Sequence, residues 1–241
     1  MSDTGYNTKT IVSGILKKLL PYILVTFIMK LIIYFCENTE WWPTIKNPGI
    51  ILGVIGFGIA ILLGAKLSVV NARLYSIEDA VCRIVGSLRV LYYKNNLADS
   101  TTEYAKKLLG TLNDPSEKNI TAVRTEMVTL IKRILSEGHD GPHLAGFTRD
   151  VSYVLHRATA EIPVAYEIFL AMTIILYTII IGLLVPGFSG FCAVFILVFV
   201  LFGASILIED MDHPLDQSSL IKVNIEPLKF FIDQEINRDI A

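Results

Sequence analysis

Two long apolar runs near the C-terminus dominate the hydrophobic pattern of the chain. They cover residues 164–185 and 188–208, and the dipeptide Pro186-Gly187 separates them. The second run has no charged side chain, and the first has only Glu167, near its start. About 20 apolar residues are enough for an α-helix to cross the hydrocarbon core of a bilayer. The pattern therefore predicts a transmembrane hairpin whose two charged flanks lie on the same side of the membrane.

Two shorter apolar runs precede this hairpin. They cover residues 19–36, interrupted by Lys30, and residues 49–65. The sequence thus predicts four transmembrane helices. Lys and Arg are frequent before the first run and between the second and third runs, and they are scarce in the other two loops. By the positive-inside rule, both termini and the middle region, residues 67–163, are expected in the cytoplasm.

The middle region has the period of a helix. One set of apolar residues, in steps of three and four, continues the second span: Val70, Leu74, Ile77, Val81, Ile84, Leu88 and Leu91. A second set follows the helix-start pattern Asp114-Pro115-Ser116-Glu117: Ile120, Val123, Met127, Leu130 and Ile134. A third set precedes the hairpin: Leu144, Phe147, Val151, Val154 and Ala158. No run alternates with a period of two, so we predict no sheet.

The expected protein is therefore all-α and membrane-embedded, in four parts. Residues 1–66 hold the N-terminal segment and transmembrane helices 1 and 2, and residues 67–163 form a cytoplasmic helical bundle. Residues 164–208 form the transmembrane hairpin of helices 3 and 4, and residues 209–241 an acidic cytoplasmic tail. The apolar stripes of the bundle are expected to pack against neighbouring helices of the same chain or of another subunit.

Composition supports a membrane protein and excludes other classes. The chain has 241 residues, of which 53% are hydrophobic and 18% charged. It has no basic stripe with interleaved aromatic residues, so nucleic acid is not an expected partner. Cys36, Cys82 and Cys192 are far apart and have no metal-ligand spacing, so we expect them to be buried apolar side chains. No nucleophile has a neighbouring base, so no catalytic residue, enzyme activity or organic cofactor is expected.

Two ionisable residues, Lys30 and Glu167, lie inside the predicted spans and are candidates for function. Their positions along the spans differ too much for them to pair. Lys30 either extends its ammonium to the headgroup layer or has a role within the membrane. Glu167 either faces a pore or binds a cation at the end of its span, with Lys66, Arg149 and Arg157 as the available partners.

An acidic run follows the fourth span. Its carboxylates are Glu209, Asp210, Asp212 and Asp216. Oxygen-rich clusters of this kind hold Ca²⁺ or concentrate cations at the mouth of a pore, and they also occur as solvated flanks of a membrane helix. All three interpretations remain open. Pro214 disfavours helical geometry in the residue before it, so Asp212-His213-Pro214 should end the fourth helix.

The second span has the best candidate for a pore face. It is rich in glycine, which permits close packing of helices, and four large apolar residues fall on one of its faces. They are Ile50, Val54, Phe57 and Ile61. Around a central axis, such side chains would form a hydrophobic constriction, and contact with lipid or with another helix explains them equally well.

Three stretches of the sequence resemble the bestrophin channels, and in particular the uncharacterised bacterial family described as bestrophin-like. They are residues 13–24, residues 63–73, and the tail formed by residues 211–214 and 221–228. The resemblance implies a homopentamer in the bacterial inner membrane, with five copies of the second span around a central pore. Of the neck positions of the family, only Phe57 is matched. The acidic run is similar to the Ca²⁺ clasp of animal bestrophins but is shorter, and bacterial members generally lack that regulation.

Three functions are therefore considered. The first is an oligomeric channel for inorganic ions. The second is a membrane scaffold that does not conduct and whose cytoplasmic bundle binds a partner protein. The third is a membrane-acting effector in bacterial defence. A hydrophobic pore and a hydrophobic packing face have the same sequence pattern, so the sequence does not decide between them.

Overall fold

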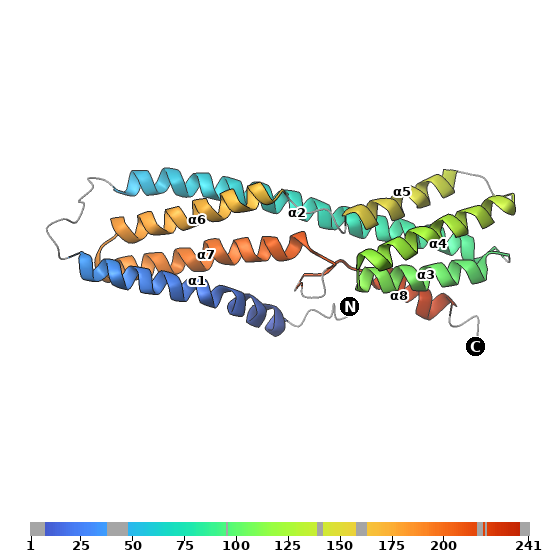
Figure 1. The fold of residues 1–241 in the computed structure, drawn as a ribbon, viewed down its shortest axis with the longest axis horizontal. Coiled ribbons are helices and arrows are strands. Elements are labelled where there is room, and N and C mark those ends of the chain that lie inside the picture. The colour runs from blue at the N-terminus through green and yellow to red at the C-terminus, as the bar shows by residue number, and fades with distance from the viewer. Residues whose placement is uncertain are drawn as a thin grey trace. The chain divides into compact units, whose positions relative to one another are not determined.

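The structure is a computed structural model that describes residues 8–37, 48–94, 96–138, 142–157, 163–215, 219 and 221–236. Every regular element within these residues is helical, which confirms the all-α fold class (Figure 1). The chain divides into two compact units. The membrane unit contains Met1–Val70 and Ile162–Asp212, and the second unit contains Asn71–Glu161 and His213–Ala241.

Four helices form the membrane unit. They are α1 (Thr8–Cys36), the first part of α2 (Pro48–Tyr92), α6 (Val164–Leu184) and α7 (Gly187–Asp212). Among the described residues, these four helices are long and apolar enough to cross a membrane, and they are the helices in which the four spans were predicted. Helix α7 packs along α1 and α6, and α1 also contacts α6 (Figure 1).

The turn of the predicted hairpin consists of Val185 and Pro186. Gly187 follows at the start of α7 with a φ angle of +68°, a left-handed conformation that residues with a Cβ rarely adopt. At its other end α7 stops at Asp212, as Pro214 predicted. Many apolar side chains of this unit are exposed in the single chain, for example Val25 of α1 and Met172 of α6. Such side chains are stable where lipid or another protein chain covers them.

The second unit is a helical bundle. It contains the rest of α2, α3 (Ala98–Asn113), α4 (Glu117–Ser136), α5 (Pro142–Arg157), the short α8 (Glu226–Phe230) and a π-helical turn, η1 (Phe231–Ile236). Helix α2 continues from one unit into the other without a break, which confirms that the second span and the first apolar stripe form one helix.

The predicted stripes form the core of this bundle. From α2, the side chains of Ile77, Val81, Ile84 and Leu88 are buried in it. All five predicted residues of α4 are buried, and the Ser116 side chain caps that helix by accepting a hydrogen bond of 3.3 Å from the Asn119 N–H. The third stripe also lies in the core at Phe147, Val151 and Val154, whereas Ala158 is outside the described residues.

Two parts of the core were not predicted. Helix α3 contributes Tyr104, Leu108 and Leu112, and the C-terminal segment contributes Leu228 and Phe231. The residues that follow His213 are therefore not only a tail, because part of this segment packs inside the second unit.

The expectation that the cysteines are buried is wrong. The side chains of Cys36, Cys82 and Cys192 are all exposed in the single chain. For Cys36 and Cys192 the error arises because apolar neighbours in a membrane sequence indicate proximity to lipid as well as to a protein core. Cys82 lies in the second unit, beside Arg83 on an exposed side of α2.

Candidate functional site

The predicted pore face of α2 is not covered by the rest of the chain. Ile50, Val54 and Phe57 are 70%, 69% and 69% exposed, and Ile61 is 54% exposed. On the opposite side of the helix, Ile59, Leu63 and Lys66 are buried. The four candidate residues therefore share one uncovered face, as their spacing predicted.

Helix α2 is attached to α6 by polar contacts at three places. The Tyr177 hydroxyl donates a hydrogen bond to the Leu52 carbonyl oxygen at 2.9 Å. The Tyr166 hydroxyl donates to the Leu62 carbonyl oxygen, also at 2.9 Å. Close to this second contact, the Lys66 ammonium lies 3.0 Å from a carboxylate oxygen of Glu167. Lys66 is one of the three partners expected for Glu167, and in the structure it forms the ion pair.

Lys30 is enclosed where α1 ends beside the turn between α6 and α7. Its side chain has no exposed surface, and Nζ donates to the Gly182 and Val185 carbonyl oxygens at 2.9 and 2.8 Å. A third bond joins Nζ to Glu37 Oε1 at 2.5 Å. The idea that Lys30 extends its ammonium to the headgroups is therefore wrong, because the ammonium already has three acceptors inside the protein.

Glu37 connects this ammonium to α7. Its second oxygen, Oε2, accepts a hydrogen bond of 2.8 Å from the Gly187 N–H, at the positive end of the α7 dipole. Burial alone would raise the pKa of Glu37, but the bonds from Lys30 and Gly187, with the charge of Lys30, hold this pKa below its usual value. The carboxylate is therefore ionised at neutral pH and compensates the buried ammonium.

Small residues make room for this ion pair. A Cβ added at Gly190 would lie 2.7 Å from Lys30 Cε and would also collide with the Val185 carbonyl oxygen. Glu37 was not recognised in the sequence, although a signal was present. Lys30 and Glu37 are seven residues apart, which is about two helical turns, so their side chains leave α1 on the same face.

The acidic run after the fourth span does not form one exposed cluster. Asp210 is buried and lies 3.1 Å from the Lys18 ammonium, Asp212 is buried, and Glu209 is exposed. Asp216 lies outside the described residues. Within the described ranges, no three His, Cys, Asp or Glu side chains gather in a group able to hold a metal ion.

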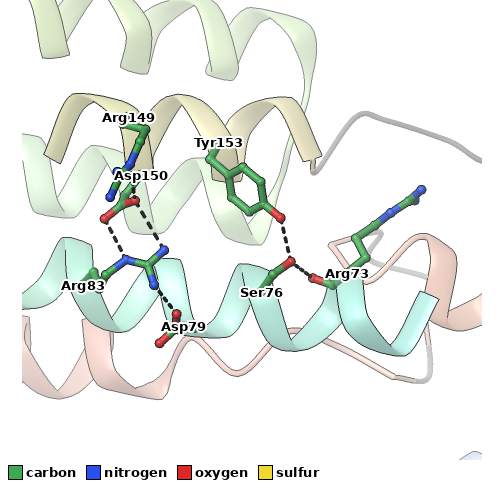
Figure 2. Close-up of polar contacts among 7 residues, drawn as sticks. All are labelled: Arg73, Ser76, Asp79, Arg83, Arg149, Asp150 and Tyr153. Carbon is green, nitrogen blue, oxygen red and sulfur yellow. Dashed lines mark hydrogen bonds and ion pairs between the residues drawn. The ribbon is translucent and has the colours of Figure 1, made fainter. Parts of the chain in front are cut away.

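A polar network joins α2 to α5 in the second unit (Figure 2). Arg83 donates two hydrogen bonds to the buried carboxylate of Asp150, from Nε at 2.9 Å and from Nη2 at 3.3 Å. It also forms an ion pair with Asp79. The hydroxyls of Tyr153 and Ser76 lie 2.7 Å apart. This network was not predicted from the sequence, although Asp79 and Arg83 have the i, i+4 spacing of a helical ion pair.

The ionised form of Asp150 stabilises the second unit. Burial favours the neutral acid and would raise the pKa of Asp150, but the bonds from Arg83 and the charges of Arg83 and Arg149 outweigh it and lower this pKa. The stabilisation is complete above the unfolded-state pKa of about 3.9, and it is lost as the pH falls through the lower pKa of the folded state.

We expect Asp150→Asn to reduce the free energy of unfolding by about 1–2 kcal/mol at neutral pH, since half-exposed Arg83 is partly screened by solvent. The loss should shrink in strong acid, where the wild-type carboxylate is itself protonated. Denaturant unfolding of the full chain in detergent, at pH 7 and over a series of acidic pH values down to about 2, measures both effects. Asp79→Asn is the control, because Asp79 is exposed and its bond to Arg83 should contribute little. An equal loss for both variants would contradict the special role of Asp150.

Comparison with known proteins identifies the fold. No protein-family model and no curated protein matches the sequence. Among solved structures, three variants of a bacterial bestrophin homolog from Klebsiella pneumoniae are similar to this chain. The first has a TM-score of 0.73 at 15% identity and covers 91% of this chain and 99% of its own. The second has a TM-score of 0.72 at 14% identity, covering 92% and 98%. The third has a TM-score of 0.69 at 15% identity, covering 93% and 99%. With nearly the full length of both chains superposed, the protein has the fold of the bacterial bestrophin homologs.

Proposed function

We propose that the protein is the subunit of an oligomeric ion channel in which α2 lines the pore. The observation that carries this proposal is the uncovered face of α2 in a chain with the bestrophin fold. The bestrophin resemblance implies five copies around one axis. In that arrangement, Ile50, Val54, Phe57 and Ile61 surround an apolar constriction, which gates by excluding water.

The side chains beside this face support contact with protein rather than with lipid. Gly53, Gly64, Ala65 and Ser68 are also exposed on α2, and small residues let helices approach closely. Both helices expose large apolar side chains, for example Leu24 and Phe35 of α1, but the exposed positions of α1 among the described residues include no glycine or alanine. We therefore expect α1 to contact lipid and α2 to contact the α2 helices of neighbouring subunits.

Phe57→Ala tests the constriction. The smaller side chain should widen and wet the narrowest point, so basal conductance in a planar bilayer should rise several-fold. Phe169→Ala is the matched control, since Phe169 of α6 is 56% exposed in the single chain but lies outside the proposed pore. If purified wild-type protein is oligomeric and passes no current under any ionic condition, the scaffold becomes the better interpretation.

The proposed cation-attracting mouth rests on Glu209, the exposed carboxylate among those described in the acidic run. In the oligomer it would form a ring of negative charge, so Glu209→Gln should shift permeability toward anions. The shift should be smaller at 1 M salt, where the screening length is roughly 3 Å. Asp210 is bound to Lys18, so its role in this proposal is structural. A metal site is not part of the proposal.

The proposed topology places both termini and the second unit in the cytoplasm. We expect a membrane-impermeant thiol reagent to modify Thr125→Cys from the cytoplasmic side and Phe188→Cys from the opposite side. Both cysteines are introduced into a chain from which Cys36, Cys82 and Cys192 have been removed, because these native thiols are exposed. The reverse labelling pattern would show that the protein is inserted the other way round.

A further inference from the structure

Tyr177 of α6 contacts the backbone of α2 through its hydroxyl group. Within the described part of the membrane unit, the backbone of α7 comes close to those of α1 and α6, whereas the backbones of α2 and α6 lie farther apart and are bridged by two tyrosine hydroxyls and one ion pair. Tyr177 itself is buried, with 7% of its surface exposed. Its hydroxyl therefore forms a buried polar bridge between the two helices at this place.

Gly56 makes this contact possible. A Cβ added at Gly56 would lie 2.5 Å from the Tyr177 hydroxyl oxygen and 3.2 Å from the ring carbon that bears it. Any larger residue at this position would push the hydroxyl away from the Leu52 carbonyl. In an α-helix the Leu52 carbonyl also accepts the N–H of Gly56, so Tyr177 binds the helical turn that directly precedes Phe57.

The other two contacts anchor α2 at a distance from this turn. Tyr166 binds the Leu62 carbonyl, and Lys66 pairs with Glu167, so both lie toward the second unit along α2. If the Tyr177 bond is lost, these contacts remain. We expect the part of α2 between Pro48 and the buried Ile59 to tilt about the anchored part.

We propose that Tyr177 is a positioning residue for the pore: its hydroxyl, admitted by Gly56, sets the distance of the Phe57 turn from the channel axis. The inference rests on the proposed channel function and extends it to a second helix. Hydrogen bonds between membrane helices are modest in strength, so breaking this one should change the balance between two positions of α2 by about three- to twentyfold.

The experiment combines two readouts on the full-length protein in lipid nanodiscs and planar bilayers. Hydrogen–deuterium exchange measures how often residues 49–60 of α2 open, and it does not depend on conduction. Tyr177→Phe removes only the hydroxyl, and Gly56→Ala displaces it. Each should raise exchange in this segment about three- to twentyfold and change the open probability of the channel. The double variant should have no larger effect than either single variant, because both remove the same contact.

Two matched controls separate this effect from general ones. Tyr22→Phe removes a hydroxyl from a tyrosine of α1 that stacks on Phe202, and Gly58→Ala adds a Cβ to α2 that meets no atom within 4 Å. Neither should change exchange in residues 49–60. Unchanged hydrogen exchange in Tyr177→Phe would show that the Tyr177 hydroxyl does not hold α2 in place, whether or not the protein conducts. Raised exchange with wild-type open probability would overturn its role in positioning Phe57. A wild-type protein that passes no current would count against the proposed channel function. The exchange data would still decide whether the Tyr177 hydroxyl holds α2 in place.

Discussion

Val81→Asp should prevent the second unit from folding. Val81 is 1% exposed and lies in the core that α2 shares with the other helices of that unit. Aspartate there would bury an ionised carboxylate without a partner, or force it to bind a proton, and it would also lose the apolar contacts of valine. Either way the cost is several kcal/mol, a large part of the 5–15 kcal/mol by which ordinary domains are stable.

Size-exclusion chromatography and hydrogen exchange of the detergent-purified protein measure this effect. Exchange should become fast throughout α3, α4 and α5, and the particle should aggregate or expand. Val90→Asp is the matched control, because it makes the same change on the same helix at a side chain that is 51% exposed. Normal size and normal protection in Val81→Asp would show that this α2 face is not part of the core.

Glu37→Gln should strongly destabilise the membrane unit. It leaves the fully buried Lys30 ammonium without a compensating charge, and removing one partner of a buried ion pair typically costs about 3–5 kcal/mol. Lys30→Met should cost less, because Glu37 would keep the Gly187 N–H. The double variant Lys30→Met/Glu37→Gln should recover part of the stability lost in Glu37→Gln, since it removes the buried charge together with its partner.

Thermal unfolding of the full chain in one detergent compares the four proteins. Lys17→Met is the control for removing a lysine from α1, because Lys17 is exposed. Glu37→Gln with the melting temperature of the wild type would contradict the importance of the pair. So would a double variant whose loss of stability equals the sum of the two single losses, because the two residues would then act independently.

The membrane spans and the main helices could be predicted from the sequence because each depends on a local pattern. A span needs an apolar run of sufficient length, and a bundle helix needs apolar residues at helical spacing. Both signals are strong in α7, α4 and the continuous helix α2. Helix α3 was missed because its buried face includes Thr101, Tyr104 and Thr111, whose polar atoms weaken an apolar stripe. The short α8 and η1 were missed because so few residues cannot establish a period.

The partners of the polar residues could not be predicted, because they depend on which helices become neighbours. The sequence by itself determined that Lys30 and Glu167 lie in spans and that Ile50, Val54, Phe57 and Ile61 share a face. Only the tertiary structure decided that Lys30 binds Glu37 and two carbonyl oxygens at the end of α6, that Lys66 is the partner of Glu167, and that Asp210 pairs with Lys18. Helical spacing determines the direction of a side chain around its own axis, whereas an ion pair requires two helices to bring opposite charges within about 4 Å. That meeting is decided by the packing of the whole unit.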